Sequence, residues 1–113
     1  MTYAEERPWG TFETICSGPT YKVKRISVKP QSRLSLQKHE HRSEHWVVVT
    51  GTGVITVEDA EILASPGTTA FIPVGAVHRL EAGDAELVLI EVQRGTHLYE
   101  EDITRLSDDY GRK

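Results

Sequence analysis

The sequence predicts an all-β protein in which short strands form a sandwich or a barrel. Three observations predict this class: short segments rich in Val, Ile, Thr and Leu, turn residues between these segments, and no sustained apolar repeat of helical period. Strands of this kind bury their apolar sides only against another sheet. A chain of 113 residues fits a single domain, 1–113, with a core that needs no disulfide.

The expected strands follow one another between residues 22 and 92. They are residues 22–28, 34–39, 45–49, 54–57, 69–72 and 87–92. The residues that separate them as turns are Pro30, Gly51 with Gly53, Pro66-Gly67, Pro73 with Gly75, and Gly83-Asp84. After the last strand, residues 100–106 are expected to form a short helix, with Ile103 and Leu106 packed against the core.

Composition excludes several classes of function. A net charge of −4 argues against a nucleic-acid partner. The chain has no apolar run of the roughly 18 residues that a membrane span needs, and residues 1–10 carry charges instead of an apolar leader. We therefore expect a soluble, cytoplasmic protein without a membrane partner. The single cysteine, Cys16, is expected to be reduced and inert.

Basic residues are concentrated in residues 22–42, which contain seven Lys or Arg and one acid, Glu40. Two interpretations are open. The stretch can be a solvated basic face, or two or three of its members can converge on an anionic substrate, because Arg and Lys bind phosphate well.

Three of the five histidines lie between residues 37 and 45. Side chains alternate between the faces of a strand, so Gln37, His39 and His41 point the same way if a strand runs through them. Two imidazoles on one face are half of a metal site. A second element, Gly67 to His78, places a further histidine after a Pro-Val-Gly turn.

These two stretches resemble the paired motifs of cupins, namely His-x-His followed by Glu and Gly, and Gly-x5-Pro-x-Gly-x2-His. The resemblance implies a conical antiparallel β-barrel, the double-stranded β-helix or jelly roll. It also implies one divalent metal, held by His39, His41 and His78 and usually by a Glu. Two departures stand out: Ala82 replaces the family's usual Asn, and only two residues separate His41 from Glu44.

That short spacing leaves the fourth ligand open between Glu44 and His45. These two residues lie on opposite faces of a regular strand, so only one of them can enter the barrel. The six-residue gap to Gly51 favours Glu44, whereas the distance from His41 favours His45. Mixed nitrogen and oxygen ligands suit zinc, manganese, iron, cobalt or nickel.

A closer resemblance covers nearly the whole chain and identifies the C-terminal domain of type II mannose-6-phosphate isomerases. It is carried by Arg7-Pro8-Trp9-Gly10, Lys24-Arg25-Ile26, Leu34-Ser35-Leu36-Gln37, His41-Arg42-Ser43-Glu44-His45-Trp46, Glu91-Val92-Gln93-Arg94-Gly95, and Glu101-Asp102-Ile103-Thr104-Arg105 through Asp109-Tyr110-Gly111-Arg112. The family's domain is commonly fused behind a mannose-1-phosphate guanylyltransferase domain. Here the resemblance implies a free-standing, metal-dependent isomerase that interconverts mannose 6-phosphate and fructose 6-phosphate.

Such an isomerase needs a base near the metal. The candidates are Glu91 and whichever of His45 and Glu44 does not bind the metal. Glu91 shares a face with Leu87 and Leu89, where a charge is costly unless a polar cavity or a partner compensates it. Arg25 is the alternative, structural partner of Glu91, or else a substrate ligand.

For the phosphate of the substrate we expect Arg42, supported by Arg79 and Lys38, because these residues adjoin the histidines in the sequence. Gln37 is expected to bind the metal or a sugar hydroxyl. Two other functions remain open for this fold: a non-catalytic cupin that binds a sugar phosphate or another small metabolite, and an iron-dependent dioxygenase. A homodimer is also expected, with Trp9 as an interface anchor.

Overall fold

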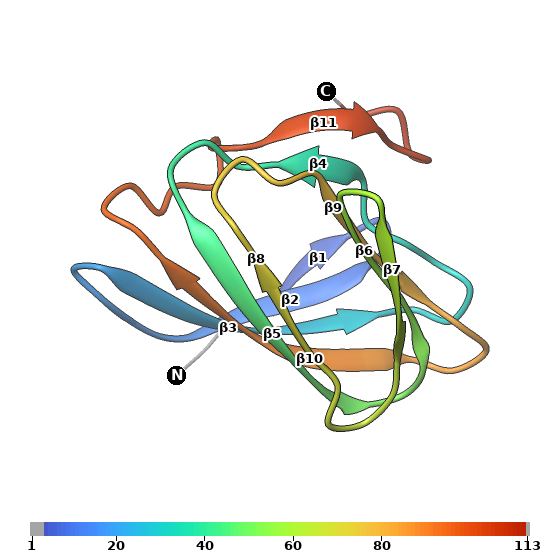
Figure 1. Ribbon diagram of the computed structural model, residues 1–113. Helices are drawn as coiled ribbons and strands as arrows, with labels where there is room; N and C mark the ends of the chain where they lie inside the picture. The colour runs from blue at the N-terminus through green and yellow to red at the C-terminus, as the bar shows by residue number, and fades with distance from the viewer. Residues whose placement is uncertain (1–3, 113) are drawn as a thin grey trace.

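The structure is a computed structural model that describes residues 4–112. Its regular elements are strands (Figure 1), which confirms the predicted all-β class. They are β1 (Ala4–Arg7), β2 (Gly10–Gly18), β3 (Tyr21–Val28), β4 (Leu36–Lys38), β5 (Ser43–Thr50), β6 (Gly53–Val57), β7 (Ala60–Ala64), β8 (Thr69–Ile72), β9 (His78–Ala82), β10 (Leu87–Arg94) and β11 (Thr104–Ser107). Among residues 4–112, no helix is long and apolar enough to cross a membrane.

The strands form two antiparallel sheets that face each other as the walls of a barrel. The larger sheet has the order β1-β2-β3-β10-β5-β8, and the smaller has the order β11-β4-β9-β6-β7. Figure 1 shows the two sheets on opposite sides of a common interior. Neighbours such as β3 and β10 are far apart in the sequence, so the barrel closes through long-range pairing.

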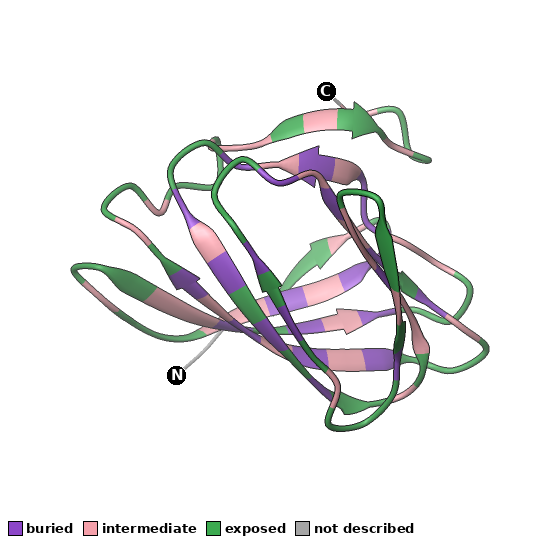
Figure 2. Cartoon of the chain, in the orientation of Figure 1, coloured by how far each residue is buried: buried purple, intermediate pink, exposed green. Residues whose placement is uncertain are grey.

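Side chains on the inner face of the larger sheet form rows across the strands, and the rows change from apolar to polar along the barrel. One buried row is apolar and contains Phe12, Ile26, Leu89 and Val48. In the next row, Lys24 lies opposite Glu91, and Glu91 lies opposite Trp46. The row beyond pairs Gln93 with Glu44. The alternating burial is visible in Figure 2. The sheet therefore carries an apolar core toward one end of the barrel and a polar site toward the other.

The six predicted strands are all present, five of them with a shifted end. The segment at residues 69–72 coincides with β8, whereas the one predicted at 34–39 narrows to Leu36–Lys38. The prediction missed β1, β2, β7, β9 and β11. The strand β2 is rich in polar residues, and its apolar members Phe12 and Ile15 have opposite exposures, so its sequence shows little periodic apolar signal.

The helix predicted at residues 100–106 is wrong. Thr104–Ser107 is the strand β11, which pairs with β4 at the edge of the smaller sheet. Leu106, expected in the core, is 53% exposed. A helix of about seven residues is marginal on its own, so the hydrogen-bond partners offered by β4 outweigh local propensity.

The predicted role of Trp9 as an interface anchor is also wrong. Its side chain is only 6% exposed and belongs to the hydrophobic core. It lines the pocket that the barrel encloses.

Candidate metal centre

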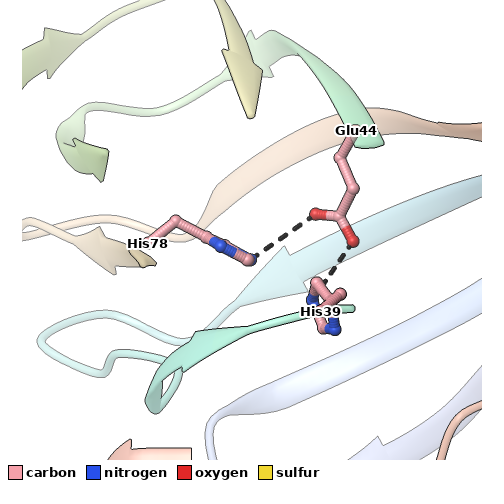
Figure 3. A group of neighbouring side chains, drawn as sticks. All are labelled: His39, Glu44 and His78. Atoms are coloured by element: carbon pink, nitrogen blue, oxygen red, sulfur yellow. Dashed lines mark ion pairs between the residues drawn. The ribbon is translucent and has the colours of Figure 1, made fainter. Parts of the chain in front are cut away.

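Two histidines and a glutamate converge inside the barrel. The side chains of His39, Glu44 and His78 are at most 3% exposed. One ligand atom from each lies within 4.8 Å of the others. The two Glu44 oxygens face one imidazole each, with Oε2 3.3 Å from Nε2 of His39 and Oε1 3.7 Å from Nε2 of His78 (Figure 3).

Local sequence explains how the three residues meet. Glu44 is on β5, whose alternation turns Glu44, Trp46 and Val48 inward. His39 follows β4, and His78 opens β9. The turn before β9 needs Gly75, whose φ of +81° is in the left-handed region, and its N–H donates to the carbonyl of His39 at 2.8 Å. The Pro-x-Gly-x2-His motif therefore ties the His78 turn to the His39 segment.

Backbone carbonyls hold both imidazoles with Nε2 toward the centre. Nδ1 of His39 donates to the carbonyl of Asp102 at 2.6 Å, and Nδ1 of His78 donates to the carbonyl of Ala76 at 2.9 Å. A carbonyl only accepts, so the proton belongs on Nδ1 and a lone pair remains on Nε2. Burial, together with the nearby Arg42 charge, lowers the pKa of His39 to about 4, and burial also lowers the pKa of His78.

This donor set fits a divalent transition metal. Neutral imidazole nitrogens and a carboxylate are the ligands that zinc, manganese, iron, cobalt and nickel share. The carbonyl contacts of Nδ1 are the supporting hydrogen bonds that metal-binding histidines generally have. The residues present therefore suit a metal bound by His39, Glu44 and His78.

Arg42 brings a positive charge into the same group. Its guanidinium is buried, donates from Nε to Oε2 of Glu44 at 2.8 Å, and lies with Nη2 3.1 Å from Nε2 of His39. Nε2 of a neutral imidazole has a single lone pair. A metal at that nitrogen therefore requires the contact between Arg42 and His39 to break.

A second buried carboxylate, Glu91, stands beside the group. Trp46 Nε1 donates to its Oε2 at 3.0 Å, and Gln93 Nε2 donates to its Oε1 at 2.7 Å. Burial, reinforced by the charge of Glu44, raises the pKa of Glu91 to about 7. Within residues 4–112, the buried Oε1 of Gln93 has no hydrogen-bond partner. This end of the barrel thus holds a carboxyl group, that of Glu91, which is able to exchange a proton. It also holds an amide oxygen, Oε1 of Gln93, which is available to accept a hydrogen bond.

The structure does not bring His41 or His45 into the buried group. The strand β4 ends at Lys38, and His41 is exposed on the bend that follows, where its ring lies 5.4 Å from that of His97. The condition on which His39 and His41 would share a face, a strand running through both, is therefore not met, and His41 lies outside the expected metal site. His45 is on the outer face of β5, with its ring 4.6 Å from that of Phe71.

Three basic residues expected near the substrate lie elsewhere. Arg79 donates to the carbonyls of Leu34 and Ser107 at 3.0 and 3.1 Å and so links β9 to the chain around β4 and β11. Lys38 pairs with Glu40 at 3.6 Å. Arg25 pairs with Glu13 on the outer face of the larger sheet, which rules out Arg25 as the partner of Glu91.

The pocket around the group has a cavity volume of about 80 Å³ and opens to solvent. Of the predicted site residues, Gln37, His39, Arg42, Glu44, His78 and Glu91 line it. It also contains basic residues that sequence reasoning missed: Arg7, Lys24, Arg105 and Arg112. For Lys24 the signal was ambiguous, because it shares the parity of Ile26 and Val28 while Val23 lies on the opposite face of the same strand.

Known proteins resemble this chain over nearly its whole length. The sequence profile of the family described as "Mannose-6-phosphate isomerase C-terminal" matches residues 2–108. The chain is 49% identical over 107 residues to the alginate biosynthesis protein AlgA of Pseudomonas aeruginosa, covering 94% of this chain and 22% of that protein.

Two further relatives match over the same length. The xanthan biosynthesis protein XanB of Xanthomonas campestris pv. campestris is 50% identical over 107 residues, with 94% of this chain and 23% of that protein covered. The mannose-1-phosphate guanylyltransferase of Escherichia coli K12 is 49% identical, with 94% and 22% covered. The chain thus spans less than a quarter of the length of these relatives.

Solved structures with low sequence identity show the fold. The capsular polysaccharide assembling protein CapF of Staphylococcus aureus superposes with a TM-score of 0.83 at 24% identity, over 95% of this chain and 34% of that chain. A cupin-2 domain from Rhodospirillum rubrum gives 0.72 at 19% identity, over 90% of this chain and 77% of that one. The fold is therefore that of a cupin barrel, as the motifs implied.

Proposed function

The chain belongs to the family of mannose-6-phosphate isomerase C-terminal domains, and on that premise we propose that it is a divalent-metal-dependent isomerase interconverting mannose 6-phosphate and fructose 6-phosphate. One observation carries the proposal: beside the buried group of His39, Glu44 and His78 lies a second buried carboxylate, Glu91, that is not part of the metal-ligand set. A non-catalytic binding protein would need the metal ligands, but it would not need a carboxyl group placed to exchange a proton.

The reaction defines what the pocket must supply. Converting the aldose to the ketose moves one proton from C2 to C1 and one from the C2 hydroxyl to the C1 oxygen. A side chain must therefore take up and return the carbon-bound proton, while positive charge stabilises the oxygens at which negative charge develops. The sugar must also be held by its hydroxyls and its phosphate.

His39, Glu44 and His78 are the residues that would hold the metal. When bound, a divalent metal supplies a Lewis acid that stabilises negative charge on the sugar oxygens. Arg42 already donates to Glu44 and can add a second positive charge toward the same oxygens. Its role as a substrate residue rests on this position in the pocket.

Glu91 is the residue we assign to the proton transfer between C1 and C2. A base works best with a pKa near the working pH, and burial moves the pKa of Glu91 to about 7. Trp46 and Gln93 donate to its two oxygens and so fix its orientation. The unpartnered Oε1 of Gln93 is suited to accept a hydrogen bond from a sugar hydroxyl.

The basic lining of the pocket suits a sugar phosphate over a neutral sugar. The cations among the lining residues are Arg7, Lys24, Arg42, Arg105 and Arg112. A low-dielectric pocket with excess positive charge favours an anionic ligand.

A coupled assay with the purified protein tests the proposal. With a divalent metal added, mannose 6-phosphate should be converted to fructose 6-phosphate without ATP or GTP, and in deuterated water the label should appear at C1 or C2 when exchange competes with transfer. Absence of turnover with zinc, manganese, cobalt, nickel and iron, in folded and metal-loaded protein, would overturn the isomerase proposal and leave a binding module.

A further inference from the structure

Lys24 is a buried cation without a role in the proton chemistry above. Its residue is only 4% exposed, on the inner face of β3 directly opposite Glu91 on β10. Its ammonium lies 4.2 Å from the centroid of the Phe12 ring. A buried ammonium is costly unless a counter-ion compensates it, so the identity of that counter-ion matters.

The counter-ion comes from outside the sheet. Nζ of Lys24 donates to Oε1 of Glu100, which lies on the segment 95–103 that runs from β10 to β11. The Glu100 side chain is 49% exposed, whereas Glu44 and Glu91, the other carboxylates of the pocket lining, are 1% and 4% exposed. Glu100 is therefore the carboxylate that can leave the pocket at small cost in buried charge.

Two other cations of the pocket have buried carboxylate partners. Arg42 donates to Glu44, and Arg112 donates to Asp108, and these carboxylate side chains are 1% and 3% exposed. Lys24 differs from these two because its carboxylate partner is half-exposed. Arg7 also has a half-exposed partner, Glu5, but the Arg7 side chain is itself 33% exposed, so Lys24 is the buried cation of the two. An incoming anion can thus pair with Lys24 by displacing the Glu100 side chain, without leaving a buried carboxylate unpaired.

The backbone around Glu100 is anchored independently of its side chain. Lys22 Nζ donates to the carbonyl of Leu98 at 2.9 Å, and the carboxylate of Asp102 accepts from the backbone N–H groups of Glu40 and His41 at 2.9 and 3.0 Å. Rotation of the Glu100 side chain leaves these hydrogen bonds intact. Displacement of the Glu100 carboxylate from Lys24 therefore needs no rearrangement of the backbone of residues 95–103.

We propose that Lys24 binds the phosphate group of the substrate, and that the Glu100 carboxylate occupies this phosphate position until the substrate displaces it. The inference rests on the proposed function for the identity of the ligand. Five cations against three carboxylates line the pocket, so it has an excess of positive charge for a dianionic phosphate. A phosphate offers more charge and more acceptor oxygens than the carboxylate it replaces.

Equilibrium binding tests this assignment without turnover, by calorimetry on the purified protein with mannose 6-phosphate, inorganic phosphate and mannose as probes. Lys24→Gln should weaken binding of both phosphate-containing probes by about tenfold or more, and Lys24→Arg should restore most of it. Glu100→Gln should shift affinity the opposite way, tightening phosphate binding by about three- to tenfold because the competing charge is gone. Binding of mannose should change little in each variant.

Arg25→Gln is the matched control, because Arg25 adjoins Lys24 on β3 but faces outward and pairs with Glu13. It should bind the probes as the unaltered protein does. Unchanged phosphate affinity in folded Lys24→Gln, or in Glu100→Gln, would overturn the inference. If the opposite shifts appear but the protein turns nothing over, the phosphate site stands and the isomerase proposal fails.

Discussion

At the scale of single residues, Glu91 is the side chain to which we assign the proton transfer. It is a buried carboxylate positioned by two donors, and it stands beside the candidate metal ligands. Glu91→Gln keeps the size of the side chain but removes the ability to take up a proton. We expect kcat to fall by about 10²- to 10⁴-fold with little change in KM, because the loss affects the transition state alone.

The coupled isomerase assay measures this change. Glu81→Gln on β9 is the control, because Glu81 faces outward and is exposed. A Glu91→Gln protein that is folded and retains the full kcat would remove Glu91 from the proton transfer.

The structure and the cupin motif disagree on one metal ligand, His41. His39 and His78 lie in the buried group, whereas His41 lies on an exposed bend. The double change His39→Ala with His78→Ala should therefore abolish stoichiometric metal, and His41→Ala should leave it unchanged. Elemental analysis of dialysed proteins decides the matter, and loss of metal in His41→Ala would contradict the geometry described here.

Alternation along strands explains which site residues could be predicted. Gln37, Glu44 and Glu91 are buried, and each has the parity of its strand's inner face. Lys24 was missed because the predicted strand at 22–28 has Val on one face and Ile with Val on the other, so parity alone does not tell which face is inside. Pairing with β10 decides it, and that partner is more than sixty residues away in the sequence.

His41 could not be placed from the sequence for a similar reason. Its backbone N–H donates to Asp102 in the segment after β10, and this contact belongs to the bend that ends the strand before His41. Local residues contain no sign of a partner 61 positions away.

At the scale of elements, the strands with strong apolar character were predictable and the edge strands were not. The inner strands β3, β5 and β10 have buried apolar residues at every second position for part of their length. The strand β11 has one partly buried residue, and it exists because β4 offers a free edge. Pairing of this kind depends on the whole barrel and leaves no mark in the local sequence. A prediction from residues 100–106 alone therefore gave a helix.

The turn before β9 offers a prediction about how the fold positions His78. Gly75 has a φ of +81°, and a Cβ there would meet no atom within 4 Å, so Gly75→Ala costs only the backbone strain of about 1–2 kcal/mol. We expect that cost in thermal unfolding. We also expect metal affinity several-fold weaker, because the strain falls between the His39 carbonyl and His78.

Gly67→Ala supplies a matched control for that turn. Gly67 has a φ of +93° and equally open surroundings, but its turn precedes β8, whose residues line no part of the pocket. It should lose similar stability and keep its metal affinity. Equal metal affinities in the Gly75 and Gly67 variants would show that the β9 turn does not position His78.

At the scale of the whole molecule, exposed apolar side chains lie on the outer face of the larger sheet at β5 and β8. The outward side chains of β5 and β8 include Val47, Val49 and Phe71, which are 44%, 47% and 51% exposed. Because Trp9 is buried, this face replaces it as the surface on which the expected homodimer would form. We predict a dimer in light scattering at micromolar concentration, and a monomer after Phe71→Lys with Val47→Lys. A monomeric unaltered protein would exclude the association.

The central claim is that the buried group of His39, Glu44 and His78 holds one divalent metal on which isomerisation depends. The most direct test is to strip the protein with a chelator, return manganese, zinc or cobalt in steps, and record bound metal and turnover of mannose 6-phosphate on the same samples. We predict that the rate rises in proportion to bound metal and stops rising at one equivalent per chain. Turnover that persists in the stripped protein, or a full equivalent of metal bound at these residues without turnover, would contradict the claim.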